Sequence, residues 1–224
     1  MSRSPLKLQA LAACVLLAFA SGASAALYTN VPNGANTGLP FASFGNAANP
    51  SGDSPKVGEV FSLVSDSLLS SFSFYALGNT LASFQLNVAQ WNPNNTAGAT
   101  LFTSGSATNL YDAAGGVTTL LFNKLGLNLD GGAKYIAYLS SNDPNVTGIQ
   151  LSRTQTFQDA SGFGVGNAYY STIPGQGWQF PFNGFLSLQY TAVTTAVPEP
   201  ASAALFIAGL GLIGTLSRRR NNLV

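Results

Sequence analysis

Between residues 26 and 197, the chain alternates apolar and polar residues in short segments, which is the pattern of half-buried β-strands. The clearest of these segments are residues 68–77, 80–91 and 185–193. Residues 134–140 are apolar on both faces, which predicts a strand buried on both sides. No sustained 3.6-residue apolar period is present. The side chains predicted to face inward are Phe72, Phe74, Ala76, Ala82, Phe84, Leu86, Val88, Leu186, Leu188, Tyr190 and Ala192.

Turn sequences separate these segments, because Gly and Asn accept positive φ and Pro fixes φ near −65°. They are Gly78-Asn79, residues 92–95, Gly115-Gly116, residues 130–132 and residues 142–145. Short strands at such intervals predict an all-β fold, an antiparallel β-sandwich or jelly roll of about 8–10 strands. Before residue 49, only residues 27–31 have a strand pattern.

The first 25 residues have the three parts of a secretory signal peptide. Arg3 and Lys7 are positive, residues 8–20 are apolar, and Ala23 and Ala25 fit a small-x-small cleavage site. We expect the Sec translocon to export the chain and signal peptidase to cleave it after residue 25.

Cys14 offers an alternative, because residues 11–14 spell a lipobox in which this cysteine would be acylated. The apolar run continues beyond it through residues 15–20, which favours cleavage at the later site. Cys14 is the single cysteine of the chain, so the mature protein can form no internal disulfide.

The C-terminal end also has three parts. An uncharged segment, residues 201–216, would form a helix of about 24 Å, slightly short of the ~30 Å hydrocarbon core of a bilayer. Basic residues after it would hold the C-terminus on the cytoplasmic side. The extended motif before the segment is Val197, Pro198, Glu199 and Pro200, and the basic stop is Arg218, Arg219 and Arg220.

These three parts, in this order, resemble the PEP-CTERM sorting signal of Gram-negative bacteria, whose tail family is also called the ice-binding protein C-terminal domain. The resemblance implies that an exosortase, a membrane-embedded cysteine transpeptidase, recognises the Pro-Glu-Pro motif. It also implies an inner-membrane intermediate, association with exopolysaccharide, and a final place at the cell surface, outer membrane or biofilm matrix. The predicted organisation is a signal peptide (1–25), an extracellular β-sandwich (26–196) and a sorting signal (197–224).

Charge excludes one class of partner. Residues 26–197 contain four basic and seven acidic residues, a net charge of −3, whereas the whole chain has +1. Nucleic-acid binding therefore has no basic surface to support it.

Catalytic chemistry is strongly limited because the chain has no histidine and no cysteine in its mature part. Ser-His-Asp and Cys-His sites and His-based zinc sites are excluded. A glycan hydrolase would need two carboxyl groups about 5–10 Å apart in one cleft. Most acids fall in predicted turns, where they normally bind their own backbone, so we expect a non-enzymatic protein. The turn acids are Asp53, Asp112, Asp130, Asp143 and Asp159.

We expect no cofactor and predict no metal site, although the loops at 130–132 and 142–145 leave a structural calcium open. Ice binding usually requires a regular array of threonines. The sequence offers one such pair, Thr154 and Thr156, without any repeat.

Four aromatic residues are the candidates for glycan binding: Trp91, Trp178, Tyr169 and Tyr170. Aromatic planes can stack on sugar rings, but aromatic residues also pack in sandwich cores. Trp91 faces away from Phe84, Leu86 and Val88, so we expect it to be the more exposed tryptophan. Three functional classes stay open: a structural or adhesive matrix protein, a carbohydrate-binding module and, as the least favoured of the three, a glycan hydrolase.

Overall fold

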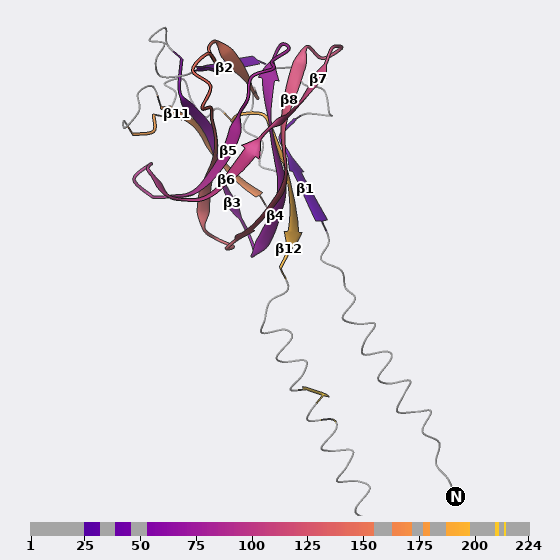
Figure 1. Ribbon diagram of the computed structural model, residues 1–224. Helices are drawn as coiled ribbons and strands as arrows, with labels where there is room; N and C mark the ends of the chain where they lie inside the picture. Colours follow the sequence, from indigo (N-terminus) through magenta and orange to yellow (C-terminus); the bar gives the residue numbers. More distant parts are fainter. Residues whose placement is uncertain are drawn as a thin grey trace, which may run out of the picture. The chain divides into compact units, whose positions relative to one another are not determined.

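The structure is a computed structural model that describes residues 25–31, 39–45, 53–154, 163–171, 177–179, 187–197, 209–210 and 213. In these residues, twelve strands form two antiparallel sheets (Figure 1). The strands are β1 Ala25–Thr29, β2 Leu39–Phe44, β3 Lys56–Leu63, β4 Ser67–Leu77, β5 Gln85–Trp91, β6 Ala97–Ser106, β7 Thr108–Asp112, β8 Val117–Leu129, β9 Lys134–Ser140, β10 Ile149–Arg153, β11 Phe163–Ser171 and β12 Tyr190–Ala196.

The larger sheet has seven strands arranged around β4. One edge of β4 pairs with β8, which pairs in turn with β7. β12 and β10 share the other edge of β4. β1 pairs with the far side of β12, and β2 pairs with the far side of β10. The smaller sheet has five strands in the order β11-β3-β9-β5-β6. The two sheets form a sandwich, as the sequence predicted.

The core lies between the inner faces of the two sheets. Phe72, Phe74 and Ala76 of β4 are fully buried against Phe84 and neighbouring side chains from β5. The other predicted inward-facing residues that the structure describes also belong to the core or pack against it. They are Ala82, Leu86, Val88, Leu188, Tyr190 and Ala192. Leu186 lies outside the described residues. Each large side chain buried in this way stabilises the fold by about 1.5–3 kcal/mol.

The predicted number of strands was too low. β2 lies in the Gly-, Asn- and Pro-rich region where we expected no strand beyond residues 27–31. It pairs with β10 across more than a hundred residues, and Phe44 packs edge-on against Phe84 at 5.2 Å between ring centroids. Pro40 is tolerated because β2 is an edge strand, where one side needs no ladder hydrogen bonds.

The predicted turns lie between strands. Asn95 and Gly132, for example, have φ values of 58° and 78°, the left-handed conformation for which Asn and Gly are suited.

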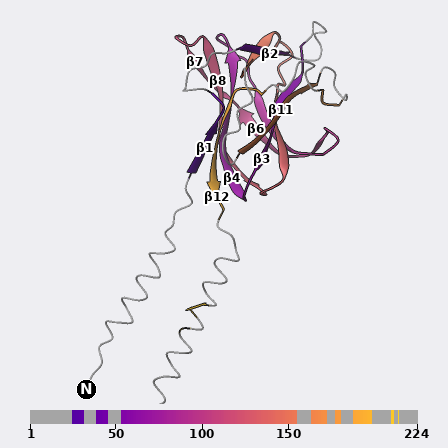
Figure 2. The same cartoon turned by 180° about the vertical axis from the view of Figure 1, so that it is seen from behind.

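The first and last strands of the sandwich are neighbours. Thr29 Oγ1 of β1 donates a hydrogen bond to the carbonyl of Tyr190 in β12 at 3.2 Å. Figures 1 and 2 show the two strands side by side and antiparallel, so β1 begins where β12 ends.

The chain divides into two units, Ala26–Thr195 and the residues at its two ends. In the second unit, Gly209, Leu210 and Ile213 are helical, and the rest of the predicted segment at 201–216 lies outside the described residues, as does Ala23. Among the residues that the structure describes, no helix is long and apolar enough to cross a membrane.

Candidate functional site

The outer face of the five-stranded sheet carries a second apolar cluster, separate from the core. It exists because alternate residues of β9 point to opposite sides: Tyr135, Ala137 and Leu139 join the core, whereas Ile136 and Tyr138 point outward. We call this cluster the aromatic face. Its members are Val60, Ala89, Trp91, Ile136, Tyr138 and Tyr169, with Ala97 and Trp178 packed against them.

Four aromatic rings make up most of this face. Trp178 lies edge-on to Tyr138 at 5.2 Å and to Trp91 at 6.1 Å between ring centroids, and Trp91 lies 4.6 Å from Tyr169. The backbone fixes Trp178 there, because its neighbour Gln179 exchanges two hydrogen bonds with Tyr170 of β11, at 2.8 and 3.1 Å.

Gly58 of β3 allows Tyr138 to lie close to the sheet. A Cβ atom at this position would lie 2.5 Å from Cβ of Tyr138 and 2.6 Å from the carbonyl oxygen of Ala137. Real Cβ atoms essentially never approach so closely, so the position of Tyr138 depends on the missing side chain.

A hollow of about 410 Å³ opens beside Trp178, and we call it the Trp178 hollow. Its volume lies within the ~300–1,000 Å³ typical of ligand pockets. Trp178 is half-buried, and the ammonium of Lys56 lies over the Tyr138 ring, 5.5 Å from its centroid. The lining residues are Pro55, Lys56, Thr96, Ala97, Gly98, Thr100, Tyr138, Ser171, Gly177 and Trp178.

A smaller hollow of about 270 Å³, the Trp91 hollow, is lined by Trp91, Asn92, Pro93, Asn95 and Lys134. Asn95 is held in place because its side-chain oxygen accepts a hydrogen bond from the Tyr169 hydroxyl at 3.1 Å. The two hollows therefore adjoin the same group of aromatic rings.

The structure brings together three of the four predicted aromatic residues: Trp91, Trp178 and Tyr169. Tyr170 lies on the opposite face of β11, where its ring packs edge-on against Phe41 at 6.5 Å. The expectation that Trp91 is exposed is wrong, because Trp91 is 7% exposed. It does face away from the core, as predicted, but Tyr169 and Trp178 cover it.

The sequence patterns did not indicate that Tyr138, Lys56 and Lys134 belong to this site. Tyr138 could have been found, because its place in the alternation of β9 puts it opposite the core-facing residues. The lysines gave no signal, since nothing in the sequence places residues 56 and 134 beside the tryptophans. Three further aromatic residues close to Trp178 in the sequence lie outside the described residues: Phe180, Phe182 and Phe185.

Two of the acids that the structure describes bond within their own turns. Asp143 accepts a hydrogen bond from the backbone N–H of Asn145 at 2.9 Å, and Asp112 accepts one from Ala114 at 3.0 Å, as predicted for turn aspartates. Asp53 differs from this prediction, because it accepts hydrogen bonds from Thr147 Oγ1 and the Gly148 N–H, which lie 94 and 95 positions later in the sequence. Burial alone would raise the pKa of Asp53, but these bonds and one from Ser43 lower it.

Neither hollow has an acidic residue among its described lining residues. No group of three or more Asp, Glu, Cys or His side chains gathers to hold a metal ion in the part of the chain that the structure describes. The aromatic face therefore offers stacking surfaces, hydroxyl and amide groups and two ammonium groups.

Comparison with the curated proteins found no match to this chain. A similar solved structure is that of the cysteine protease and lectin-like domains of Cwp84, a surface layer associated protein of Clostridium difficile. It is 14% identical, with a TM-score of 0.41 over 63% of this chain and 32% of that chain. The present chain thus matches about a third of the length of that structure.

The family comparison concerns the C-terminal end. The model of the PEP-CTERM protein-sorting motif matches residues 196–221, a range that contains the predicted Pro-Glu-Pro motif, the apolar segment and the three arginines. The chain therefore carries a PEP-CTERM protein-sorting motif at its C-terminal end, as the sequence predicted.

Proposed function

We propose that this protein is an exported, non-enzymatic surface or biofilm-matrix protein of a Gram-negative bacterium, sorted by an exosortase-type enzyme. The match to the sorting motif at residues 196–221 is the observation that carries this proposal. Signal peptidase cleaves after Ala25, residues 201–216 hold the chain in the inner membrane, and the exosortase acts at the Pro-Glu-Pro motif. The enzyme then releases the sandwich or transfers it to the cell surface.

The test is replacement of Pro198, Glu199 and Pro200 together by alanine in the producing bacterium. The full-length form should accumulate in the inner membrane, because the processing enzyme no longer recognises its substrate. Asn222→Ala, outside the matched range, is the control. Normal processing and surface delivery of the triple variant would contradict the proposal.

A second candidate function is carbohydrate binding by the aromatic face. The half-buried Trp178, at the wall of a hollow of about 410 Å³ that also contains hydroxyl groups, supports it. Sugar rings present C–H faces that pack on aromatic planes, while hydroxyl and amide side chains bind sugar hydroxyls. A ligand held in this way would connect the exported sandwich to exopolysaccharide.

Carbohydrate binding is tested by titrating the full chain, in detergent, with exopolysaccharide from the producing organism. Trp178→Ala should abolish saturable binding and leave the protein folded. Tyr111→Ala is the matched control, since Tyr111 is 46% exposed on β7 of the other sheet. Absence of binding by the folded wild-type chain would leave the matrix protein with a structural role alone.

A further inference from the structure

The two hollows of the aromatic face share one chemical feature: each combines a tryptophan with a lysine. The Trp178 hollow contains Lys56, and the Trp91 hollow contains Lys134. The mature sequence has four basic residues, so half of them line these hollows. None of its seven acidic residues is among the described lining residues of either hollow.

This distribution opposes the overall charge of the domain. With a net charge of −3, the mature domain as a whole repels anions, and surface charges beyond a Debye length of about 8–10 Å are screened. The described lining residues of the two hollows nevertheless include two positive groups and no negative one. An anionic group on a ligand would therefore be attracted to the aromatic face more than to an average part of the surface.

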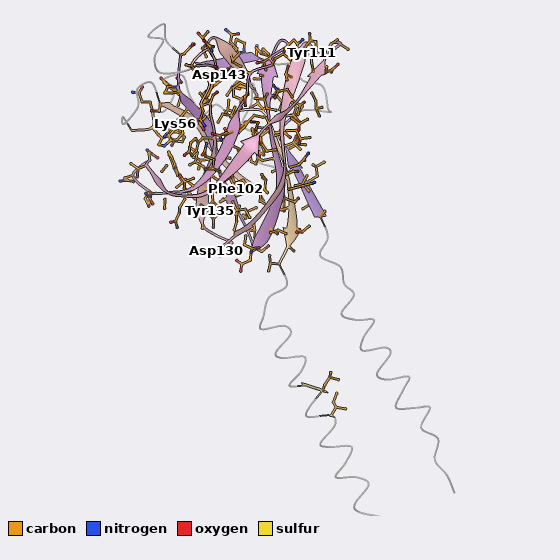
Figure 3. The ribbon with its side chains drawn as sticks, viewed as in Figure 1. Lys56, Phe102, Tyr111, Asp130, Tyr135 and Asp143 are labelled. Atoms are coloured by element: carbon orange, nitrogen blue, oxygen red, sulfur yellow. The ribbon has the colours of Figure 1, made fainter. Side chains whose placement is uncertain are left out.

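Lys56 lies within reach of a ligand that stacks on Trp178. Trp178 and the Lys56 ammonium both lie beside the same Tyr138 ring, at 5.2 Å and 5.5 Å from its centroid. A sugar ring that packs on Trp178 would thus place a carboxylate substituent close to an ammonium group. Figure 3 labels Lys56 at the start of β3.

The two lysines project from the same face of the sheet, at a distance that suits a polymer. Val57 pairs with Leu139 and Ser62 pairs with Lys134, so Lys56 and Lys134 lie near opposite ends of the β3–β9 pair. Six residues of strand correspond to roughly 20 Å. This length accommodates several consecutive sugar units, with the aromatic rings between the two positive groups.

We propose that the aromatic face binds an acidic polysaccharide, a chain of uronic acid units, with carboxylates at Lys56 and Lys134 and sugar rings on Trp178 and its neighbours. This inference rests on the proposed carbohydrate binding and adds the class of ligand and two residues that determine specificity. The ion pairs between these lysines and the ligand carboxylates would be exposed to solvent, where each contributes little affinity. The lysines therefore contribute selectivity, and the aromatic rings contribute most of the affinity.

The chain has two tryptophans, and both belong to the aromatic face, so intrinsic tryptophan fluorescence reports on this site alone. The experiment titrates the full chain in detergent with polygalacturonate, with its methyl-esterified form and with dextran. We expect saturable binding of polygalacturonate that weakens with added salt, and weaker binding of the two uncharged polymers.

Lys56→Gln and Lys134→Gln should each weaken polygalacturonate binding about two- to fivefold, and the double variant should weaken it further. Binding of dextran should not change. Lys124→Gln is the matched control, since it removes the same charge from a position outside both hollows. Thermal unfolding verifies that each variant is folded.

The outcomes separate this inference from the function on which it rests. Equal binding of dextran and polygalacturonate, lost in Trp178→Ala but unchanged in the lysine variants, would overturn the acidic ligand and retain carbohydrate binding. An equal effect of Lys124→Gln would also overturn the inference, because the charge effect would then not be local. If none of the polymers and no native exopolysaccharide binds, carbohydrate binding itself fails.

Discussion

The two faces of β9 are equally buried but differ in what covers them. Ala137 and Leu139 on the inner face pack against the opposite sheet, whereas Tyr138 on the outer face is covered by aromatic side chains and the short segment at residues 177–179. The opposite sheet, which covers the inner face, cannot separate from it without unfolding the domain. The side chains that cover the outer face have the Trp178 hollow and the Trp91 hollow beside them. Burial of similar extent thus stabilises the fold on one side and forms a candidate binding surface on the other.

Phe72→Ala, on the inner side of the sandwich, should cause the largest loss of stability. Phe72 is fully buried, and its ring lies 5.0 Å from Phe74, 5.7 Å from Tyr190 and 6.0 Å from Phe61 between centroids. Truncation leaves a cavity, so the free energy of unfolding should fall by about 3–5 kcal/mol. Urea denaturation measures this change. A loss below 1 kcal/mol would show that the inner face is not the main source of stability.

Gly58→Ala should give the next largest effect, because it acts on both stability and the outer face. The new Cβ would collide with Tyr138 and the backbone of Ala137, which should cost about 1–3 kcal/mol and displace the tyrosine ring. Saccharide binding should weaken together with stability.

Gly105→Ala provides the control for this substitution, since a Cβ at position 105 in β6 meets no atom within 4 Å. If both variants are equally stable, the close contact beneath Tyr138 does not constrain the aromatic face.

The third prediction concerns Glu59, which lies on the core side of β3 and is fully buried. Its carboxyl group is hydrogen-bonded to Ser187 Oγ at 2.8 Å and to the Leu188 N–H at 2.9 Å. Burial raises the pKa of Glu59 well above its usual value of 4.5, although both hydrogen bonds act in the opposite direction. At pH values between 4.5 and the raised pKa, the folded protein therefore retains a proton on Glu59 that the unfolded chain releases.

It follows that the free energy of unfolding should decrease as pH rises above about 4.5 towards the pKa in the folded state. One proton corresponds to a slope of at most about 1.4 kcal/mol per pH unit. Glu59→Gln preserves the shape of a neutral carboxyl group and should remove this part of the slope. Urea denaturation of both proteins at several pH values measures it, and identical slopes would contradict a proton held at Glu59.

The smallest effect on stability is expected from Trp178→Ala on the outer side. Because Trp178 is half-buried and lies outside the core, its loss should cost about 1 kcal/mol or less. Trp178→Ala should nevertheless weaken saccharide binding more than Phe72→Ala, Gly58→Ala or Glu59→Gln. A severe loss of stability would place Trp178 with the core residues and remove the contrast between the faces.

Local patterns were sufficient to predict much of the sandwich. The alternation in β4 and β5 identified the inward side chains, since period two assigns residues to faces without reference to their partners. β2 was not predicted, because its pairing partner, β10, lies far away in the sequence and the region around β2 is rich in Gly, Asn and Pro. Long-range pairing gives no local signal.

The candidate site was predicted less completely for a related reason. Aromatic residue type identified Trp178 and Tyr169, but it could not distinguish Tyr170, which points to the opposite face. The exposure of Trp91 depends on Tyr169 and Trp178, which come from distant parts of the sequence, so it was predicted incorrectly. The sorting motif was fully predictable, because its information lies in the order of contiguous residues.

The pairing of β1 with β12 has a consequence for the order of events during biogenesis. Thr29 and Tyr190, which are bonded across these strands, are 161 residues apart in the chain. Contacts with such separation form late and slow the folding of all-β domains. In the export that we propose, the seven-stranded sheet can be completed only after its final strand, β12, has crossed the membrane, and the sorting motif at residues 196–221 follows that strand directly. On this route, the fold cannot mature before the sorting signal arrives.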